Sequence, residues 1–172
     1  MNVSLIIPTK NRPDMLLRLM KYYRELRFRG KILIGDSSDR DISVHTAQSL
    51  SENFSGIDYE YYYLPDTPFG PAMNFLNGKI KTNYAVYVAD DDFLVPDAVE
   101  ACVVFLDTHP DYVAAHGIGA LIGSRSGESA AVQSAGCYRQ PVVEQDTAVG
   151  RFGSFFESYS VSLFSIHRAD TW

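Results

Sequence analysis

The chain has 172 residues, with 15 Lys and Arg against 21 Asp and Glu, which gives a net charge of −6. A domain of about 150 residues buries roughly 70% of its unfolded surface, so this length suffices for one hydrophobic core without disulfide or metal staples. The acidic balance excludes a general nucleic-acid-binding protein, which needs a basic face to displace counterions from phosphates. The cysteines, Cys102 and Cys137, are too few for a disulfide scaffold and lack the spacing of a zinc site.

We expect neither a signal peptide nor a membrane span in this sequence. The N-terminus has no basic segment, and its apolar run is broken by Pro8, so it is not a signal peptide. No stretch approaches the ~20 apolar residues of a membrane span. We therefore expect a cytoplasmic protein with reduced cysteines, either free or peripheral at the cytoplasmic face of a membrane.

Short apolar runs alternate with helical patterns over most of the chain. Parallel strands need crossover connections, which helices provide, so this alternation predicts an α/β fold: a mixed, mainly parallel sheet with helices on both faces. Strands are predicted over residues 3–7, 31–35, 59–64 and 84–89, and helices over 13–27, 72–80 and onward from Pro96. A further helix is predicted after the capping residues 36–39, and Ala47, Leu50 and Phe54 mark it.

The last part of the sequence has a weaker pattern. Residues 117–136 are rich in Gly, Ser and Ala, which is equally typical of hairpins and of a mobile loop. Beyond them the sequence predicts a helix over 146–159, a strand over 161–166 and the first turn of a further helix over 167–172.

Three consecutive aspartates, Asp90, Asp91 and Asp92, follow the strand predicted over 84–89. Asp90 and Asp92 point the same way if that strand continues. Converging carboxylates repel each other unless a hard cation such as Mg²⁺ or Mn²⁺ neutralises them, and such a cation can bridge the phosphates of a nucleotide diphosphate. We favour this metal site over the alternative, an acidic solvated loop that caps the helix beginning at Pro96.

Asp36 lies at the end of the second predicted strand. A carboxylate there can accept a hydrogen bond from a nucleobase or a ribose hydroxyl. Capping of the next helix, which Ser37, Ser38 or Asp39 can also supply, explains Asp36 equally well. The tyrosines at 61–63 can stack on a base or sugar, although alternate packing within a strand is the commoner reason for such residues.

The loop after the first strand, residues 8–12, carries several polar groups. The hydroxyl of Thr9, the amide of Asn11 and the guanidinium of Arg12 suit contacts to ribose and phosphate. Asn11 or Arg12 can instead cap the helix that begins at Pro13.

Four blocks of sequence, in this order, resemble the nucleotide-binding half of a family 2 glycosyltransferase. They are residues 4–12 (SLIIPTKNR), 34–39 (IGDSSD), 70–74 (GPAMN) and 86–92 (VYVADDD), and the resemblance covers about residues 2–110. It implies the Rossmann-like GT-A fold and metal-assisted transfer of a sugar, with inversion, to the hydroxyl of a carbohydrate or other acceptor, as in polysaccharide biosynthesis. The implied donor is a nucleotide-diphosphate sugar, with a UDP-sugar expected.

The resemblance also implies roles for individual residues. Asp92, with Asp90, would hold Mn²⁺ or Mg²⁺ as part of an Asp-x-Asp motif, and Asp36 would bind the base. Met73 stands where the family usually has an arginine, so a basic residue near the donor is missing. The residues implied to line the nucleotide-sugar site are Pro8, Thr9, Asn11, Arg12, Asp36, Asn74, Asp90 and Asp91.

The same resemblance divides the chain at residue 110. Residues 1–110 would form the nucleotide-sugar-binding half, and residues 111–172 an incomplete acceptor-side region of the same domain. The catalytic residue is unknown: the family's general base is expected beyond Trp172, which implies a C-terminally truncated domain. Glu144, Asp146 and Glu157 are possible substitutes, but each is more simply a solvated carboxylate.

Two other functions stay open for the sequence. The first is a non-catalytic module that binds a nucleotide sugar on the same fold. The second is a sugar nucleotidyltransferase, which is expected to have a glycine-rich phosphate loop after its first strand. Residues 8–12 contain no glycine, which counts against this second alternative.

Overall fold

The structure is a computed structural model that describes residues 1–124, 132–159 and 162–171. The chain divides into two compact units. The first unit comprises Met1–Ala115 and Phe164–Trp172, and the second comprises His116–Leu163. The division predicted at residue 110 concerns which ligand each part binds, and it stays a prediction.

The first unit contains a six-stranded sheet with the order β3-β2-β1-β4-β8-β5. Strands β1, β2, β3 and β4 are parallel to one another, whereas β8 is antiparallel to both β4 and β5. The predicted mixed, mainly parallel α/β sheet is therefore confirmed. The strands span Val3–Thr9 (β1), Lys31–Asp36 (β2), Tyr59–Tyr63 (β3), Tyr84–Tyr87 (β4), Ala114–Ala115 (β5) and Ile166–Arg168 (β8).

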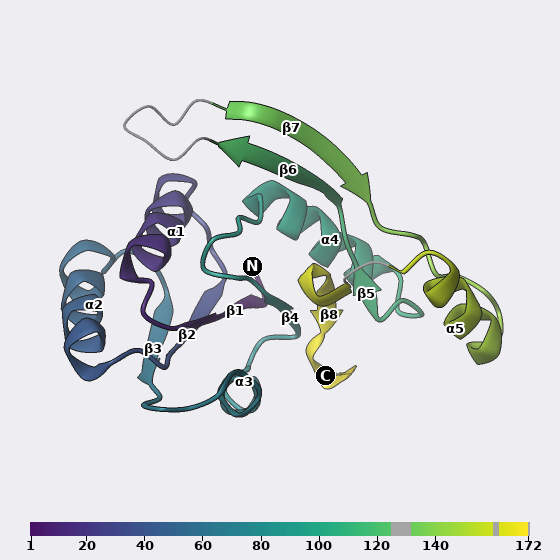
Figure 1. Ribbon diagram of the computed structural model, residues 1–172. Coiled ribbons are helices and arrows are strands. Elements are labelled where there is room, and N and C mark those ends of the chain that lie inside the picture. Colours follow the sequence, from purple (N-terminus) through teal and green to yellow (C-terminus); the bar gives the residue numbers. More distant parts are fainter. Residues whose placement is uncertain (125–131, 160–161, 172) are drawn as a thin grey trace. The chain divides into compact units, whose positions relative to one another are not determined.

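Helices cover both faces of this sheet, as predicted (Figure 1). Alternate side chains of β1 enter two separate cores: Leu5 and Ile7 pack in the larger core, and Ile6 packs in the smaller one. Residues of α1, α2 and α4 complete the larger core, and residues of α3 complete the smaller. The helices span Pro13–Glu25 (α1), Arg40–Asn53 (α2), Phe69–Asn77 (α3) and Pro96–Thr108 (α4).

Helix α1 follows the predicted apolar stripe but ends before residue 27. Its buried side chains are Leu16, Leu19, Met20 and Tyr23. The chain leaves the helix because Arg27 adopts a φ of 52° and the N–H of Phe28 donates to the carbonyl oxygen of Tyr23 at 2.9 Å. Such a left-handed residue closes the last turn of many helices.

Two further boundaries differ from expectation. Helix α3 begins at Phe69 rather than at 72, because the carbonyl of Pro68 accepts from the N–H of Ala72 at 3.0 Å and the intervening Pro71 is tolerated in a first turn. Strand β4 ends at Tyr87 rather than at 89, after which only Val88 still donates to β1 before the chain turns. The aspartates therefore lie in a turn and do not alternate as strand residues.

The strand predicted over 161–166 is wrong in its described part. Ser162–Phe164 is a 3-10 helix, and the strand is Ile166–Arg168, followed by a 3-10 turn at Ala169–Thr171. The guanidinium of Arg168 explains the shift, because it donates to the carbonyl oxygens of Leu106 at 2.6 Å and Tyr112 at 2.7 Å and so anchors this segment beside α4. Residues 161 and 172 of the two predicted elements lie outside the described residues.

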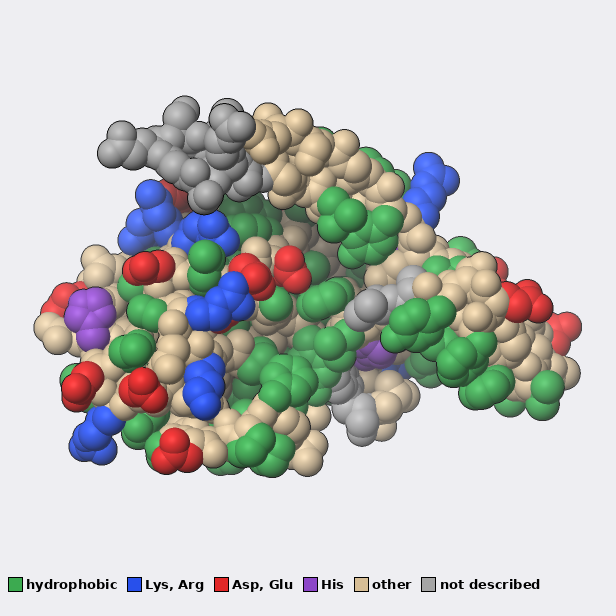
Figure 2. Space-filling view, in the orientation of Figure 1, with side chains coloured by type: hydrophobic (Ala, Val, Ile, Leu, Met, Phe, Trp, Pro, Cys, Tyr) green, Lys and Arg blue, Asp and Glu red, His purple; other side chains and the backbone are tan. Residues whose placement is uncertain are grey.

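The second unit contains a hairpin and one helix within its described residues. Strands β6 (Ile118–Ser124) and β7 (Val132–Arg139) are antiparallel, which confirms the hairpin alternative there, while 125–131 lie outside the described residues. Helix α5 (Ala148–Glu157) confirms the helix predicted over 146–159. Apolar side chains gather over α5 (Figure 2). None of the helices in the described part of the chain is both long and apolar enough to cross a bilayer.

Candidate functional site

Polar side chains from three strand ends meet at the carboxyl edge of the six-stranded sheet. Thr9 ends β1 and lies opposite Asp36, which ends β2, in the parallel register. The N–H of Ser37 donates to the carbonyl oxygen of Thr9 at 2.9 Å. The hydroxyl of Thr9 in turn donates to Oδ2 of Asp90, just beyond β4, at 2.7 Å. Thr9, Asp36 and Asp90 therefore all lie at the carboxyl edge of the sheet.

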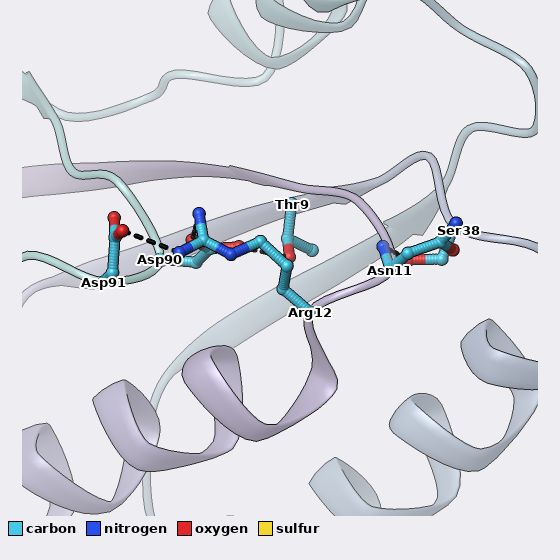
Figure 3. A network of polar contacts seen from close by, with 6 residues as sticks. All are labelled: Thr9, Asn11, Arg12, Ser38, Asp90 and Asp91. Atoms are coloured by element: carbon cyan, nitrogen blue, oxygen red, sulfur yellow. Dashed lines mark hydrogen bonds and ion pairs between the residues drawn. The ribbon is translucent and has the colours of Figure 1, made fainter. Parts of the chain in front are cut away.

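Arg12 joins the loop after β1 to two of the three aspartates (Figure 3). Its Nη1 lies 2.7 Å from Oδ1 of Asp90, and its Nη2 lies 2.6 Å from Oδ2 of Asp91. Asp90 is only 3% exposed, and both of its oxygens are engaged, one by Arg12 and one by Thr9. A buried carboxylate is stable only when it is paired in this way.

These contacts change the acidity of the groups that make them. The hydrogen bond from Arg12 lowers the pKa of Asp91. The hydrogen bond to Asp91, and next the charge of Asp90, raises the pKa of Arg12. The pair therefore stays ionised on both sides at neutral pH.

Asp92 differs from its two neighbours. It is exposed, and its carboxylate makes no hydrogen bond or ion pair within the described residues. The surrounding protein removes part of its hydration, which raises the pKa of Asp92, and the charges of Asp91 and Asp90 raise it further. A divalent cation would relieve this repulsion.

The residues at this edge fit a cation that is shared with a ligand. Among residues 1–124, 132–159 and 162–171, no group of three or more His, Cys, Asp or Glu side chains is placed to hold a metal by itself. Mg²⁺ in particular is usually held by one or two carboxylates together with substrate phosphates and water. Asp92 has the unengaged carboxylate that such a site requires, whereas Asp90 already binds Arg12 and Thr9.

Asp36 is 1% exposed and does not cap α2. The N-cap residue of α2 is Asp39, which makes no side-chain capping bond either, so the capping explanation is wrong for this loop. The carboxylate of Asp36 instead accepts from the N–H of Ser38 at 2.8 Å and from the hydroxyl of Tyr61 at 2.6 Å. The sequence pattern around Tyr61 indicates stacking or strand packing and gives no sign of this hydrogen bond.

The loop residue Asn11 connects the ends of β1 and β2. Its φ of 55° is left-handed, which Asn tolerates better than most residues. Its N–H donates to Oγ of Ser38 at 2.7 Å (Figure 3), and its side-chain oxygen accepts from the N–H of Asp39 at 2.9 Å. Arg12 is the N-cap residue of α1 without a side-chain capping bond, so capping by Asn11 or Arg12 is wrong.

The other predicted site residues have different positions. Pro8 lies within β1, opposite Gly35 of β2. Asn74 is exposed on α3, the helix that completes the smaller core. Within the described residues, its side chain makes no contact to the network around Arg12. Its place in a donor site stays a prediction. Glu144, Asp146 and Glu157 are exposed residues of the second unit.

Comparisons with known proteins bear on the fold and the family. Residues 4–156 match the family described as glycosyl transferase family 2. No curated protein matches the sequence.

Several solved structures resemble this chain at low sequence identity. The crystal structure of TarS 1-349 from S. aureus has a TM-score of 0.63 at 16% identity and covers 98% of this chain and 47% of that one. The same protein in complex with UDP-GlcNAc has a TM-score of 0.62 at 16% identity, covering 98% and 46%. The mannosyltransferase PcManGT from Pyrobaculum calidifontis, in complex with GDP-Man and Mn²⁺, has a TM-score of 0.57 at 16% identity, covering 66% and 34%.

These likenesses concern the fold. The GT-A fold that the sequence resemblance implied is confirmed by them. The chain spans about half the length of TarS 1-349.

Proposed function

This chain belongs to glycosyl transferase family 2, and we propose that it binds a nucleotide-diphosphate sugar at the carboxyl edge of its sheet as the donor for transfer to an acceptor hydroxyl. The observation that carries the proposal is the network that joins the ends of β1 and β4 through Thr9, Arg12 and Asp90. In open α/β sheets, ligands bind outside the carboxyl ends of the strands.

The ligands of the structural neighbours support this donor class. TarS 1-349 was solved with UDP and with UDP-GlcNAc, and PcManGT with GDP-Man and Mn²⁺. We expect a UDP-sugar here, with a carbohydrate or another hydroxyl compound as acceptor. Inversion at the sugar carbon is the part of the proposal that rests on family membership alone.

Each group at the edge has a role that its chemistry suits. Thr9 and Asn11 supply a hydroxyl and an amide for ribose, with Pro8 forming the rigid wall beside them. Arg12 holds Asp90 and Asp91 in place and neutralises much of their charge. This leaves Asp92 as the carboxylate with the greatest net attraction for a cation.

Asp92 would hold a Mn²⁺ or Mg²⁺ ion on the donor diphosphate, and Asp90 would join it only by giving up its bond to Thr9 or to Arg12. Such a cation stabilises the negative charge that develops on a nucleoside diphosphate as it leaves the sugar. Thr9 and Asn11 would orient the donor, and Arg12 keeps Asp90 and Asp91 paired until the donor binds.

None of the described residues is assigned here as the general base. Such a base must come within about 3 Å of the acceptor hydroxyl. Glu144, Asp146 and Glu157 belong to the second unit, whereas the strand ends of the donor edge belong to the first. The donor site can therefore be tested separately from turnover.

Calorimetric titration of the chain with UDP, GDP and UMP, with and without Mn²⁺, tests the proposal. We expect UDP or GDP to bind, and Mn²⁺ to tighten that binding much more than the binding of UMP, which has no second phosphate for the cation to bridge. Absence of binding by both diphosphates, with and without Mn²⁺, would overturn the proposal.

A further inference from the structure

Tyr61 is placed by the sheet register to reach the end of the neighbouring strand. Strands β2 and β3 are parallel, with Ile34 opposite Tyr61 and Asp36 opposite Tyr63. Side chains two residues apart on a strand share a face, so Tyr61 is the diagonal neighbour of Asp36 on the side covered by α1 and α2. Its hydroxyl lies 2.6 Å from Oδ2 of Asp36 and 3.1 Å from the carbonyl oxygen of Ser43 on α2.

The Asp36 carboxylate is held at both of its oxygens. Oδ1 accepts from the N–H of Ser38 at 2.8 Å, and Oδ2 accepts from Tyr61. The two donors bind different oxygens, one from the loop of Asp36 itself and one from β3, so rotation of the carboxylate breaks at least one bond. Because only 1% of Asp36 is exposed, little of its carboxylate is accessible to a ligand. The two hydrogen bonds fix the direction in which that part can accept.

The N–H of Ser38 and the hydroxyl of Tyr61 both donate to Asp36. An ionised carboxylate can only accept hydrogen bonds. A carboxylate has about four lone-pair directions, so one bond at each oxygen leaves room for a further donor. Burial, and next the hydrogen bond to Asp36, raises the pKa of Tyr61, which keeps its hydroxyl protonated and donating. An incoming group must therefore also be a donor.

Resting on the proposed function, we propose that Tyr61 is a positioning residue that orients Asp36 toward a nucleobase with a ring N–H, and that it thereby sets the preference among donors. Uracil and guanine carry such an N–H on the edge that pairs with other bases, whereas cytosine and adenine present an unprotonated ring nitrogen there. A fixed acceptor favours the first two bases and repels the lone pair of the others.

The strand supplies matched controls for this proposal. Tyr59 and Tyr63 lie on the same face of β3 as Tyr61, two residues to either side. Neither hydroxyl makes a hydrogen bond within the part of the chain that the structure describes. Tyr59→Phe and Tyr63→Phe therefore remove the same atom from the same strand without changing the support of Asp36.

The test compares dissociation constants of UDP, GDP, CDP and ADP, all with Mn²⁺, for the wild type and the three Tyr→Phe variants. We expect the wild type to prefer UDP or GDP, and the separate UDP and GDP arms show which base is taken. Tyr61→Phe should lower that preference over CDP and ADP by about tenfold, the scale of a hydrogen bond to a charged group. The two control variants should keep the wild-type ratios.

Pyrophosphate with Mn²⁺ separates base recognition from damage to the fold, because it has the two phosphates and no base. Unchanged pyrophosphate affinity in Tyr61→Phe, together with lost base preference, supports the proposal. A wild-type preference ratio in Tyr61→Phe, or an equal loss in Tyr59→Phe, overturns it while leaving the donor site in place. Failure of the wild type to bind any nucleotide diphosphate would instead overturn the proposed function, and this inference with it.

Discussion

The buried carboxylate of Asp90 depends on two side chains that replace its water. Thr9 donates to one oxygen and Arg12 to the other. A hydrogen bond to a charged group stabilises a protein more than one between neutral groups, and the loss of one partner leaves part of the desolvation cost uncompensated. These bonds therefore support the fold as well as the site.

The variant Thr9→Val keeps the branched shape of the residue and removes its hydroxyl. We expect it to lower the free energy of unfolding by about 1–3 kcal/mol, because Asp90 loses a donor inside the protein. Urea denaturation measures this change. The control Thr9→Ser keeps the hydroxyl and should stay closer to the wild type, and equal stability of the Val variant and the wild type would contradict the role of this bond.

Sequence reasoning identified which residues reach the edge better than which residues bond to each other there. Thr9, Asp36 and Asp90 could be predicted to converge because the carboxyl ends of parallel strands meet at one edge. The bonds from Arg12 to Asp90 and Asp91 depend on side-chain rotamers and on where β4 ends. The bond from Tyr61 to Asp36 depends on the register of β3 against β2, which the sequence does not specify.

The connection from α1 to β2 is tight at Gly30. A Cβ atom at this position would lie 2.8 Å from the backbone carbonyl oxygen of Val3 and would also overlap the ring of Phe28. Backbone at the start of β1 cannot move aside without disturbing the central strand of the sheet. Glycine is therefore required here for close approach.

Gly30→Ala should destabilise the protein by about 1–3 kcal/mol, as overpacking commonly does. Gly56→Ala is the matched control, because a Cβ atom there meets nothing within 4 Å. Chemical denaturation of both variants gives the comparison. The close approach at Gly30 is refuted if the two substitutions have the same effect.

The edge strand β3 is joined to β2 by a polar cluster that responds to pH. Glu60 accepts from the hydroxyl of Tyr62 and lies 2.9 Å from Nζ of Lys31. The hydrogen bond from Tyr62, and next that from Lys31, lowers the pKa of Glu60. A lowered folded-state pKa means that this stabilisation is present above the ordinary Glu pKa and is lost as the pH falls through the lowered value.

Glu60→Gln should therefore be less stable than the wild type near neutral pH, by a margin that shrinks on acidification. Unfolding in urea at about pH 6 and about pH 3 measures the margin at each end of the window. Glu25→Gln serves as control, since Glu25 is an exposed residue of α1 that lies 3.8 Å from Lys21. A margin for Glu60→Gln that does not change with pH would contradict the assignment.

The elements that sequence patterns missed are those decided by distant contacts. The helices and the strands of the first half follow local periodicity and were predicted to within a few residues. The apolar run over 161–166 predicts the C-terminal strand too early, since the strand spans Ile166–Arg168. What decides its position is Arg168, whose guanidinium binds carbonyl oxygens of Leu106 and Tyr112, far away in sequence.

At the scale of the whole molecule, the acidic charge of the chain is locally balanced. Acidic and basic side chains are interspersed over the visible face of the first unit (Figure 2). Arg12 against Asp90 and Asp91 is one such pairing, and it leaves Asp92 with the uncompensated charge. The net charge of −6 thus includes a local site for a cation.

The described groups of the proposed donor site belong to one unit of the molecule. Thr9, Arg12, Asp36 and Asp92 all lie within Met1–Ala115. The proposed binding of a metal–diphosphate at this edge therefore uses groups of the first unit. It can be tested on the chain as it stands, although the chain spans about half the length of TarS 1-349.

The most direct test is the Mn²⁺ dependence of UDP binding in Asp92→Asn, with Asp111→Asn as the control. Asp111 is an exposed aspartate in the turn after α4, so its substitution changes the net charge equally. We predict that Mn²⁺ tightens UDP binding to the wild type and to Asp111→Asn, and that Asp92→Asn loses about tenfold or more of this gain, the scale on which metal sites respond to lost support. An unchanged Mn²⁺ effect in Asp92→Asn, or the same loss in Asp111→Asn, would contradict the account.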